Sequence, residues 1–119
     1  MTTKVSLANF DDTLFSLTQG QIPDAPRITN VIVANVNYAA TGGTTLSSNT
    51  GGYLKILGSN FITGCQVLVR RGALKSATTV TRIDSTELRA EMPTSNVGLN
   101  ILFVTNPDGA SGLSSITYV

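Results

Sequence analysis

The chain has 119 residues, enough for one domain with a modest core. The formal net charge is +1 and only 13% of the residues are charged, so no global field favours nucleic acid or an anionic membrane. The single cysteine, Cys65, excludes an internal disulfide, and without histidine the commonest general base and metal ligand is missing. A mean hydropathy of +0.18 indicates either surface covered by partners or a β domain with few charges.

The first 25 residues differ in pattern from the rest, and we predict that they form an N-terminal arm. Apolar residues recur at helical spacing until Pro23 and Pro26 end the pattern. The segment is too apolar for a solvated tail, so it is either a small helix packed on its own domain or, as we favour, an arm that docks on a neighbour. The expected anchors are Leu7, Phe10, Leu14, Phe15 and Leu17. The start lacks the long apolar core of a secretory signal, and no run reaches transmembrane length, so we expect synthesis in a cytoplasm without export by that route.

From residue 26 onward the sequence reads as short strands separated by turns. The first strand is predicted from Ile28 to Tyr38, with Ile32, Ala34 and Val36 on its buried face. A long loop follows at 39–52, and the stretch Asn106–Gly109 matches a type I turn. Seven strands with turns every 8–12 residues predict an all-β, immunoglobulin-like β-sandwich over residues 26–119. The six later strands are expected at 53–57, 66–70, 78–82, 88–92, 99–105 and 114–119.

Alternation within these strands predicts both a core and an exposed apolar face. The residues expected between the two sheets are Leu54, Ile56, Val67, Val69, Leu88, Leu99, Ile101, Phe103, Ile116 and Tyr118. The strands 66–70 and 99–105 should be neighbours in one sheet. Their opposite faces carry Leu68, Leu102 and Val104, which we expect to form an outward patch that the arm or another subunit covers.

Four stretches of the chain carry a resemblance to a known family: Pro26–Val31, Gly51–Phe61, Ser85–Leu88 followed by Met92-Pro93, and Gly98–Gly109. In order and spacing they resemble the IPT/TIG family of immunoglobulin-like domains. This family occurs in plexins, Rel-type transcription factors, bacterial surface proteins, polysaccharide-acting enzymes and phage virion proteins. The resemblance implies the sandwich fold and offers no catalytic residues to carry over. The loop at 39–52 is longer than the family's usual link, and the N-terminal arm has no family counterpart.

The remaining polar residues do not suggest catalysis. Asp84 and Asp108 fall in predicted turns, and Glu87 and Glu91 flank Arg89 on a solvated strand face. We therefore expect no enzyme, no cofactor and no metal site. A second group, Arg70, Arg71, Lys75 and Arg82, fits a solvated sheet edge better than a nucleic-acid site, because interleaved exposed aromatics are absent.

These features predict a non-enzymatic structural protein of a tailed-phage virion. It would decorate or cement the capsid or an appendage through the N-terminal arm and the apolar sheet face. The expected partners are capsid or tail subunits or further copies of the chain, with neither nucleic acid nor membrane. The alternative is a carbohydrate- or protein-binding IPT module of a bacterial surface or polysaccharide-acting protein, with Tyr38 and Tyr53 flanking the long loop as its exposed aromatics. A DNA-associated IPT domain is a third reading, and it predicts salt-sensitive DNA binding.

Overall fold

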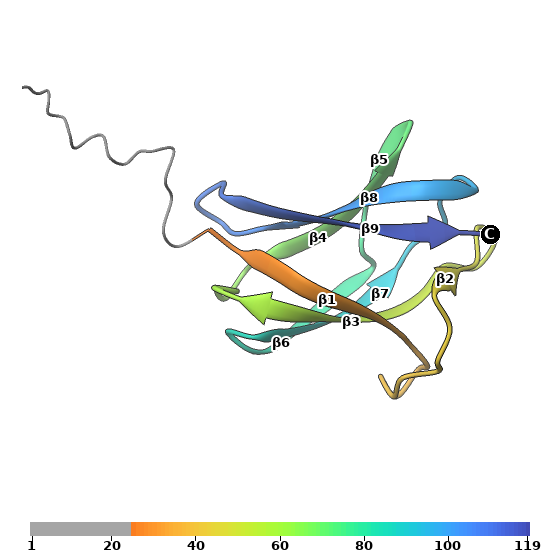
Figure 1. The fold of residues 1–119 in the computed structure, drawn as a ribbon. Coiled ribbons are helices and arrows are strands. Elements are labelled where there is room, and N and C mark those ends of the chain that lie inside the picture. Colours follow the sequence, from red (N-terminus) through yellow and green to blue (C-terminus); the bar gives the residue numbers. More distant parts are fainter. Residues whose placement is uncertain (1–24) are drawn as a thin grey trace, which may run out of the picture.

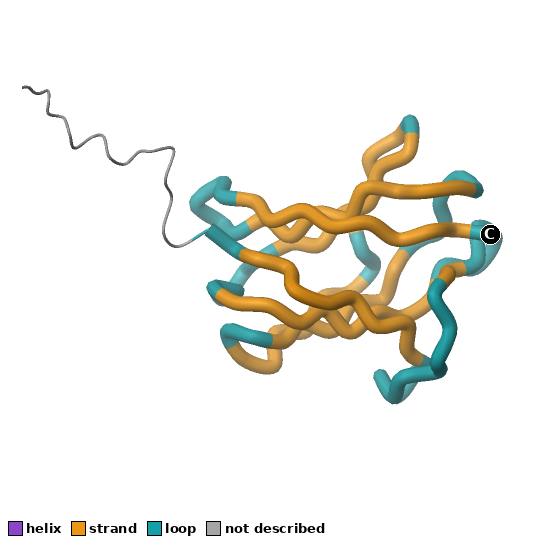
Figure 2. Tube along the Cα trace, viewed as in Figure 1, coloured by secondary structure: helices purple, strands orange, loops and turns teal. Residues whose placement is uncertain are grey.

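Two β-sheets pack face to face in residues 25–119, the part of the chain that this computed structural model describes (Figure 1). The four-stranded sheet has the order β1 (Arg27–Ala34), β3 (Gly52–Ser59), β7 (Glu87–Met92) and β6 (Thr79–Asp84). The five-stranded sheet has the order β2 (Thr45–Leu46), β9 (Ser111–Tyr118), β8 (Gly98–Thr105), β4 (Gln66–Arg71) and β5 (Ala73–Ser76). Strands and loops make up the whole described part (Figure 2), and none of it forms a helix that could cross a membrane.

The predicted all-β class and the two-sheet arrangement are confirmed. The described residues contain nine strands rather than the expected seven. One of the additional strands, β2, lies inside the predicted loop 39–52 and pairs with the end of β9 in parallel. The other, β5, folds back on β4 across Gly72, which has a φ of 80°. The predicted arm, with its five apolar anchors, lies outside the described residues except for Ala25.

Most of the predicted core is confirmed. Successive residues of a strand point to opposite faces, so each inward row holds every second residue. In β3, β4 and β7 these inward rows are fully buried, as expected, and two residues of β9 join them. The confirmed core residues are Leu54, Ile56, Val67, Val69, Leu88, Ile116 and Tyr118.

The predicted orientation of β8 is wrong. Leu102 and Val104 are completely buried, whereas Leu99 is 59% exposed, Ile101 is 45% exposed and Phe103 is only partly buried. Both faces of this strand are apolar, so alternation alone does not distinguish them. The true inner face also carries Asn100, and a polar residue there made it resemble the outer face.

Asn100 is tolerated in the core because its side chain is hydrogen-bonded at both ends. Its Nδ2 donates to the carbonyl oxygens of Asn96 and Gly98, each at 3.0 Å. Its Oδ1 accepts a 2.6 Å hydrogen bond from Ser95 Oγ. A buried polar group is costly mainly when it is unpaired, so this network offsets the cost of removing the amide from water.

The predicted orientation of β1 is wrong beyond its first residues, because the strand is bulged, although Ile28 packs against the core and Ala34 is buried as expected. A register shift between Ile28 and Asn30 changes which residues face inward. Val31 and Val33 consequently pack against the core, opposite Ile56 and Leu54 of β3. The strand ends at Ala34, so the residues predicted to continue it lie in a turn. Of these, Val36 is 64% exposed.

The turn between β8 and β9 has the predicted form. Gly109 N donates to Asn106 O at 2.9 Å, and Gly109 has a φ of 94°. The side chain of Asn106 is buried, and its Nδ2 donates to Asn60 O at 2.9 Å. This side chain therefore ties the β8–β9 turn to the loop that follows β3.

The orientation of β8 predicts losses of stability of very different size for two leucines of the same strand. Leu102→Ala should lower the free energy of unfolding by about 2–5 kcal/mol, because it leaves a cavity in the core. Leu99→Ala should lower it by less than about 1 kcal/mol, because most of that side chain is already in water. Urea denaturation of both variants measures the difference. A larger loss from Leu99→Ala would contradict the observed register.

The positive φ of Gly109 predicts different losses of stability for three variants of this turn. Gly109→Val should destabilise the domain by about 1–3 kcal/mol, because a β-branched residue is strained at positive φ. Gly109→Asn is the matched control and should cost less, since asparagine tolerates this conformation and the space around Gly109 is open. Asp108→Asn should change little, because it keeps an oxygen that can accept from Ala110 N. Equal thermal midpoints for all three variants would contradict the conformational argument.

Candidate docking face

The outer surface of the five-stranded sheet carries a continuous group of large apolar side chains, which we call the apolar face. Three of its members come from β8, and the others come from β4, β5 and β9. The residues are Leu68, Leu74, Leu99, Ile101, Phe103 and Leu113.

Strand register brings these side chains together. Phe103 lies directly opposite Leu68 of β4 on one side and Leu113 of β9 on the other. Side chains that are paired across neighbouring strands project from the same face of the sheet, so these three form a row. In the next row, Ile101 lies opposite Arg70, which in turn lies opposite Leu74 of β5.

The apolar face is open to solvent in the described structure. Leu113 is 62% exposed and Leu74 is 59% exposed, in addition to the exposed leucine and isoleucine of β8. Single exposed apolar residues are ordinary on soluble proteins, but a contiguous group across four strands is typical of a surface that binds another protein segment.

The sequence anticipated such a face on the correct pair of strands but assigned some wrong residues to it. Leu68 projects outward as expected. The outward position predicted for Leu102 and Val104 is wrong, because both are fully buried, and the opposite row of β8 takes their place. Leu74 and Leu113 were missed. Leu113 could have been found by extending the last predicted strand back past Ser114. Alternation with the inward Ile116 then places Leu113 on the outer face.

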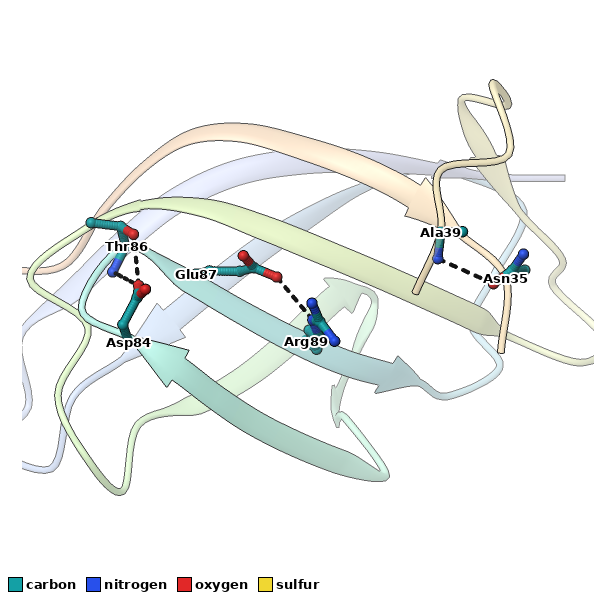
Figure 3. Close-up of polar contacts among 6 residues, drawn as sticks. All are labelled: Asn35, Ala39, Asp84, Thr86, Glu87 and Arg89. Carbon is teal, nitrogen blue, oxygen red and sulfur yellow. Dashed lines mark hydrogen bonds and ion pairs between the residues drawn. The ribbon is translucent and has the colours of Figure 1, made fainter. Parts of the chain in front are cut away.

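A second surface feature is an aromatic cluster at the four-stranded sheet. The rings of Tyr38 and Tyr53 make an edge-to-face contact, with centroids 5.5 Å apart and planes at 87°. The guanidinium of Arg89 lies over the Tyr38 ring, 5.7 Å from its centroid. Arg89 Nε also donates to Glu87 Oε2 at 2.8 Å (Figure 3). Part of the Tyr38 ring is therefore covered by Arg89, and the charge of Arg89 is paired with Glu87.

Tyr38 has an unusual backbone conformation for a non-glycine residue, with a φ of 60°. A turn built on Asn35 supports it. Tyr38 N donates to Asn35 O at 2.8 Å, and Asn35 Oδ1 accepts from Ala39 N at 3.1 Å (Figure 3). The asparagine side chain thus fixes the position from which Tyr38 reaches its neighbours.

The pKa shifts of Cys65 and Asp84 are explained by burial and by hydrogen bonds within the fold. Burial raises the pKa of the Cys65 thiol, which favours its protonated, weakly nucleophilic form. At Asp84, a hydrogen bond from Thr86 Oγ1 lowers the carboxyl pKa, and Thr86 N donates to the same oxygen (Figure 3). This arrangement is the turn chemistry expected at that position. Within residues 25–119, no three His, Cys, Asp or Glu side chains are grouped so that they could hold a metal ion.

The predicted basic group is divided between the two sheets. Arg70, Arg71 and Lys75 lie on the hairpin of β4 and β5, whereas Arg82 is on β6. Arg82 Nε donates to Phe61 O at 2.8 Å, and Arg71 Nη1 donates to Leu99 O at 3.2 Å. Two of the four cations therefore bind backbone carbonyls of the domain itself.

No family model matches the chain, and no curated protein shows significant similarity to it. The resemblance to the IPT/TIG family therefore stays a prediction from the sequence. The two-sheet fold and the apolar face are the observations from which a function can be inferred.

The burial of Tyr118 predicts an alkaline limit to stability. Its hydroxyl donates to Pro93 O at 2.8 Å, and burial raises its pKa to about 12, from an ordinary value near 10. Because the folded state holds this proton more tightly, the associated stability is complete below pH 10 and is lost as the pH rises through about 12.

The test compares the wild type with Tyr118→Phe by urea denaturation at several pH values. Near pH 7 the variant should be less stable by about 1 kcal/mol, because it lacks the hydrogen bond. Between pH 10 and 12 the wild type should lose about 2–3 kcal/mol that the variant does not lose, so their order reverses. A stability difference that stays constant with pH would contradict the assigned burial.

Proposed function

We propose that this protein is a non-enzymatic structural subunit of a tailed-phage virion. Its immunoglobulin-like sandwich would decorate or cement the capsid or an appendage, bound through the apolar face and the N-terminal arm. The observation that carries the binding part of the proposal is the exposed apolar face on β4, β5, β8 and β9. The virion setting is supported by the IPT/TIG resemblance, since that family occurs in phage virion proteins.

The chemistry of the apolar face suits a lasting attachment. Permanent interfaces are more hydrophobic than transient ones, and fully burying one Leu or Phe side chain contributes roughly 1.5–3 kcal/mol. Within the described residues, Leu99, Ile101 and Leu113 are 59%, 45% and 62% exposed, so a partner that covers them gains part of this free energy. In a shell with many copies, even a modest contact per subunit gives high occupancy.

The non-enzymatic part of the proposal is supported by the roles of the charged groups. Asp84 caps a turn and Glu87 pairs with Arg89. Asp108 likewise accepts a hydrogen bond from Ala110 N within its own turn. The Cys65 thiol is buried and has a raised pKa. Each of these groups has a contact that explains its position in the fold without substrate chemistry.

The proposal predicts that charge on the apolar face prevents attachment. The double variant Leu99→Lys with Ile101→Lys should keep the sandwich folded, because neither side chain lies in its core. Its occupancy on purified particles should fall at least about tenfold, because the contact would bury two unpaired charges. The matched control, Val36→Lys with Ile83→Lys, changes residues of similar exposure away from this face and should attach normally.

Quantitative gels of gradient-purified particles provide the measurement. Equal occupancy for both double variants would show that attachment does not use the apolar face. Finding the wild-type protein only in the infected-cell supernatant, and never in purified particles, would reject the virion setting.

The aromatic cluster favours a second candidate function, which is glycan binding. Sugars stack on exposed aromatic rings beside polar groups, and Tyr38 and Tyr53 lie together with Arg89 and Glu87. Arg89 already covers part of the Tyr38 ring, so this surface is less free than the apolar face. A glycan array gives the test: a strong signal that Tyr53→Ala abolishes, while Leu99→Lys does not, would favour this alternative.

A further inference from the structure

We propose that, in the free subunit, residues 7–17 of the arm pack on the apolar face of the same chain. This inference goes beyond the proposed function, because it concerns the chain before any partner binds. It assigns one occupant to the surface formed by β4, β5, β8 and β9. The argument rests on where the described chain begins, how far the arm reaches, and what the two surfaces carry.

The described chain begins against the inner side of β9, near the start of that strand. Ala25 O accepts a hydrogen bond from Asn60 Nδ2 at 3.2 Å, and Pro26 is buried. The Pro26 carbonyl lies against Gly112 so closely that an added Cβ there would stand 2.4 Å from its oxygen. Gly112 faces the sandwich interior, whereas the next residue of β9, Leu113, projects from the opposite side of the strand and belongs to the apolar face. Figure 1 shows the start of β1 next to the turn between β8 and β9.

The route from this point to the outer surface passes an edge of β9 that has no hydrogen-bonded neighbour but has the start of β1 packed beside it. Within the described residues, β2 pairs with β9 only at Thr117 and Tyr118, at the far end of the strand. Near Ser111–Leu113, β9 therefore has β8 as its hydrogen-bonded neighbour on one side and no paired strand on the other. A segment that leaves at residue 25 can cross this edge, beside the start of β1, without breaking a strand pairing.

The arm is long enough to cover the apolar face. Eight residue steps separate Ala25 from Leu17, and an extended chain of that length spans up to about 28 Å. The distance along β8 from Phe103 to Leu99 is four residue steps, or about 13 Å. The tether can therefore place residues 7–17 over the whole face without strain.

The two surfaces also match in composition. The arm offers two phenylalanines and three leucines within 11 residues, to cover a face made of leucine, isoleucine and phenylalanine. Asp11 and Asp12 lie among those apolar residues, and Arg70 lies within the apolar face. Residues 1–24 hold three aspartates and one lysine, whereas residues 25–119 hold seven Lys and Arg and four Asp and Glu. The arm therefore has a negative net charge, and residues 25–119 have a positive net charge.

The arm of the same chain is favoured as the occupant over the arm of a second copy, because a short tether joins it to the domain that carries the apolar face. A linked segment experiences an effective concentration in the millimolar range at a site within its reach. A second copy of the chain supplies an equal concentration of arms only when the protein itself is millimolar. At lower concentrations, each arm therefore meets its own apolar face first.

A disulfide between engineered cysteines tests the contact in the full chain. Leu14→Cys is combined with Ile101→Cys, and the native Cys65 is kept because its thiol is buried. Mild oxidation should give a monomer in which the cysteines introduced at positions 14 and 101 are joined by a disulfide, identified by peptide mass. Its rate of formation should stay constant when the protein concentration is raised from about 1 to 100 μM, because the reaction is intramolecular.

The matched control combines Leu14→Cys with Thr81→Cys, an exposed outward position on the four-stranded sheet. Its bond should form at least about tenfold more slowly. Equal rates for the two pairs would overturn the proposal, because they would show an arm without a preferred site. A covalent dimer whose rate rises with protein concentration would also overturn it and would assign the face to a second copy.

A second variant separates packing from accidental oxidation. Phe10→Asp, added to the Leu14→Cys and Ile101→Cys pair, should slow the bond at least about tenfold, whereas Asn9→Asp should not. Equal slowing by both would show that added charge, rather than loss of an apolar contact, is responsible, and it would overturn the proposal. The cross-link is measured on the free subunit and particle occupancy on virions, so either proposal can fail while the other stands.

Discussion

The pairing of β8 between β4 and β9 is the constraint on which both the core and the apolar face depend. Each residue of β8 faces either the sandwich interior or the outer surface, and the strand has large apolar residues on both sides. The observed register places Leu102 and Val104 in the interior and leaves Ile101 and Phe103 for the outside. A core strand and an exposed apolar surface are therefore made from one stretch of eight residues.

The class of fold could be predicted from the sequence, because alternation in β3, β4 and β7 is unambiguous. In each of these strands one face is apolar and the other is polar or mixed, as in Leu88 and Ala90 beside Glu87 and Arg89. The turn at Gly109 was predictable for a similar local reason, since proline and glycine at fixed positions select one backbone conformation.

The orientations of β1 and β8 could not be predicted, for two different physical reasons. In β1, a bulge between Ile28 and Asn30 changes the inward row partway along the strand, and bulges have no reliable sequence signature. In β8, the inward position of Asn100 depends on Ser95 and Asn96, whose placement arises only in the folded chain. The exposed apolar surface was consequently predicted on the correct sheet, but with Leu102 and Val104 wrongly included.

The buried amide of Asn100 has a consequence for how the domain folds. A slip of β8 by one residue would exchange its faces and bury Leu99, Ile101 and Phe103, which together are at least as hydrophobic as the native inner row. Burial alone therefore does not penalise this alternative pairing. The native pairing gives Asn100 its three hydrogen-bond partners, all of which lie within five residues of it in the sequence. In this strand, polar contacts select the register that the hydrophobic effect leaves undecided.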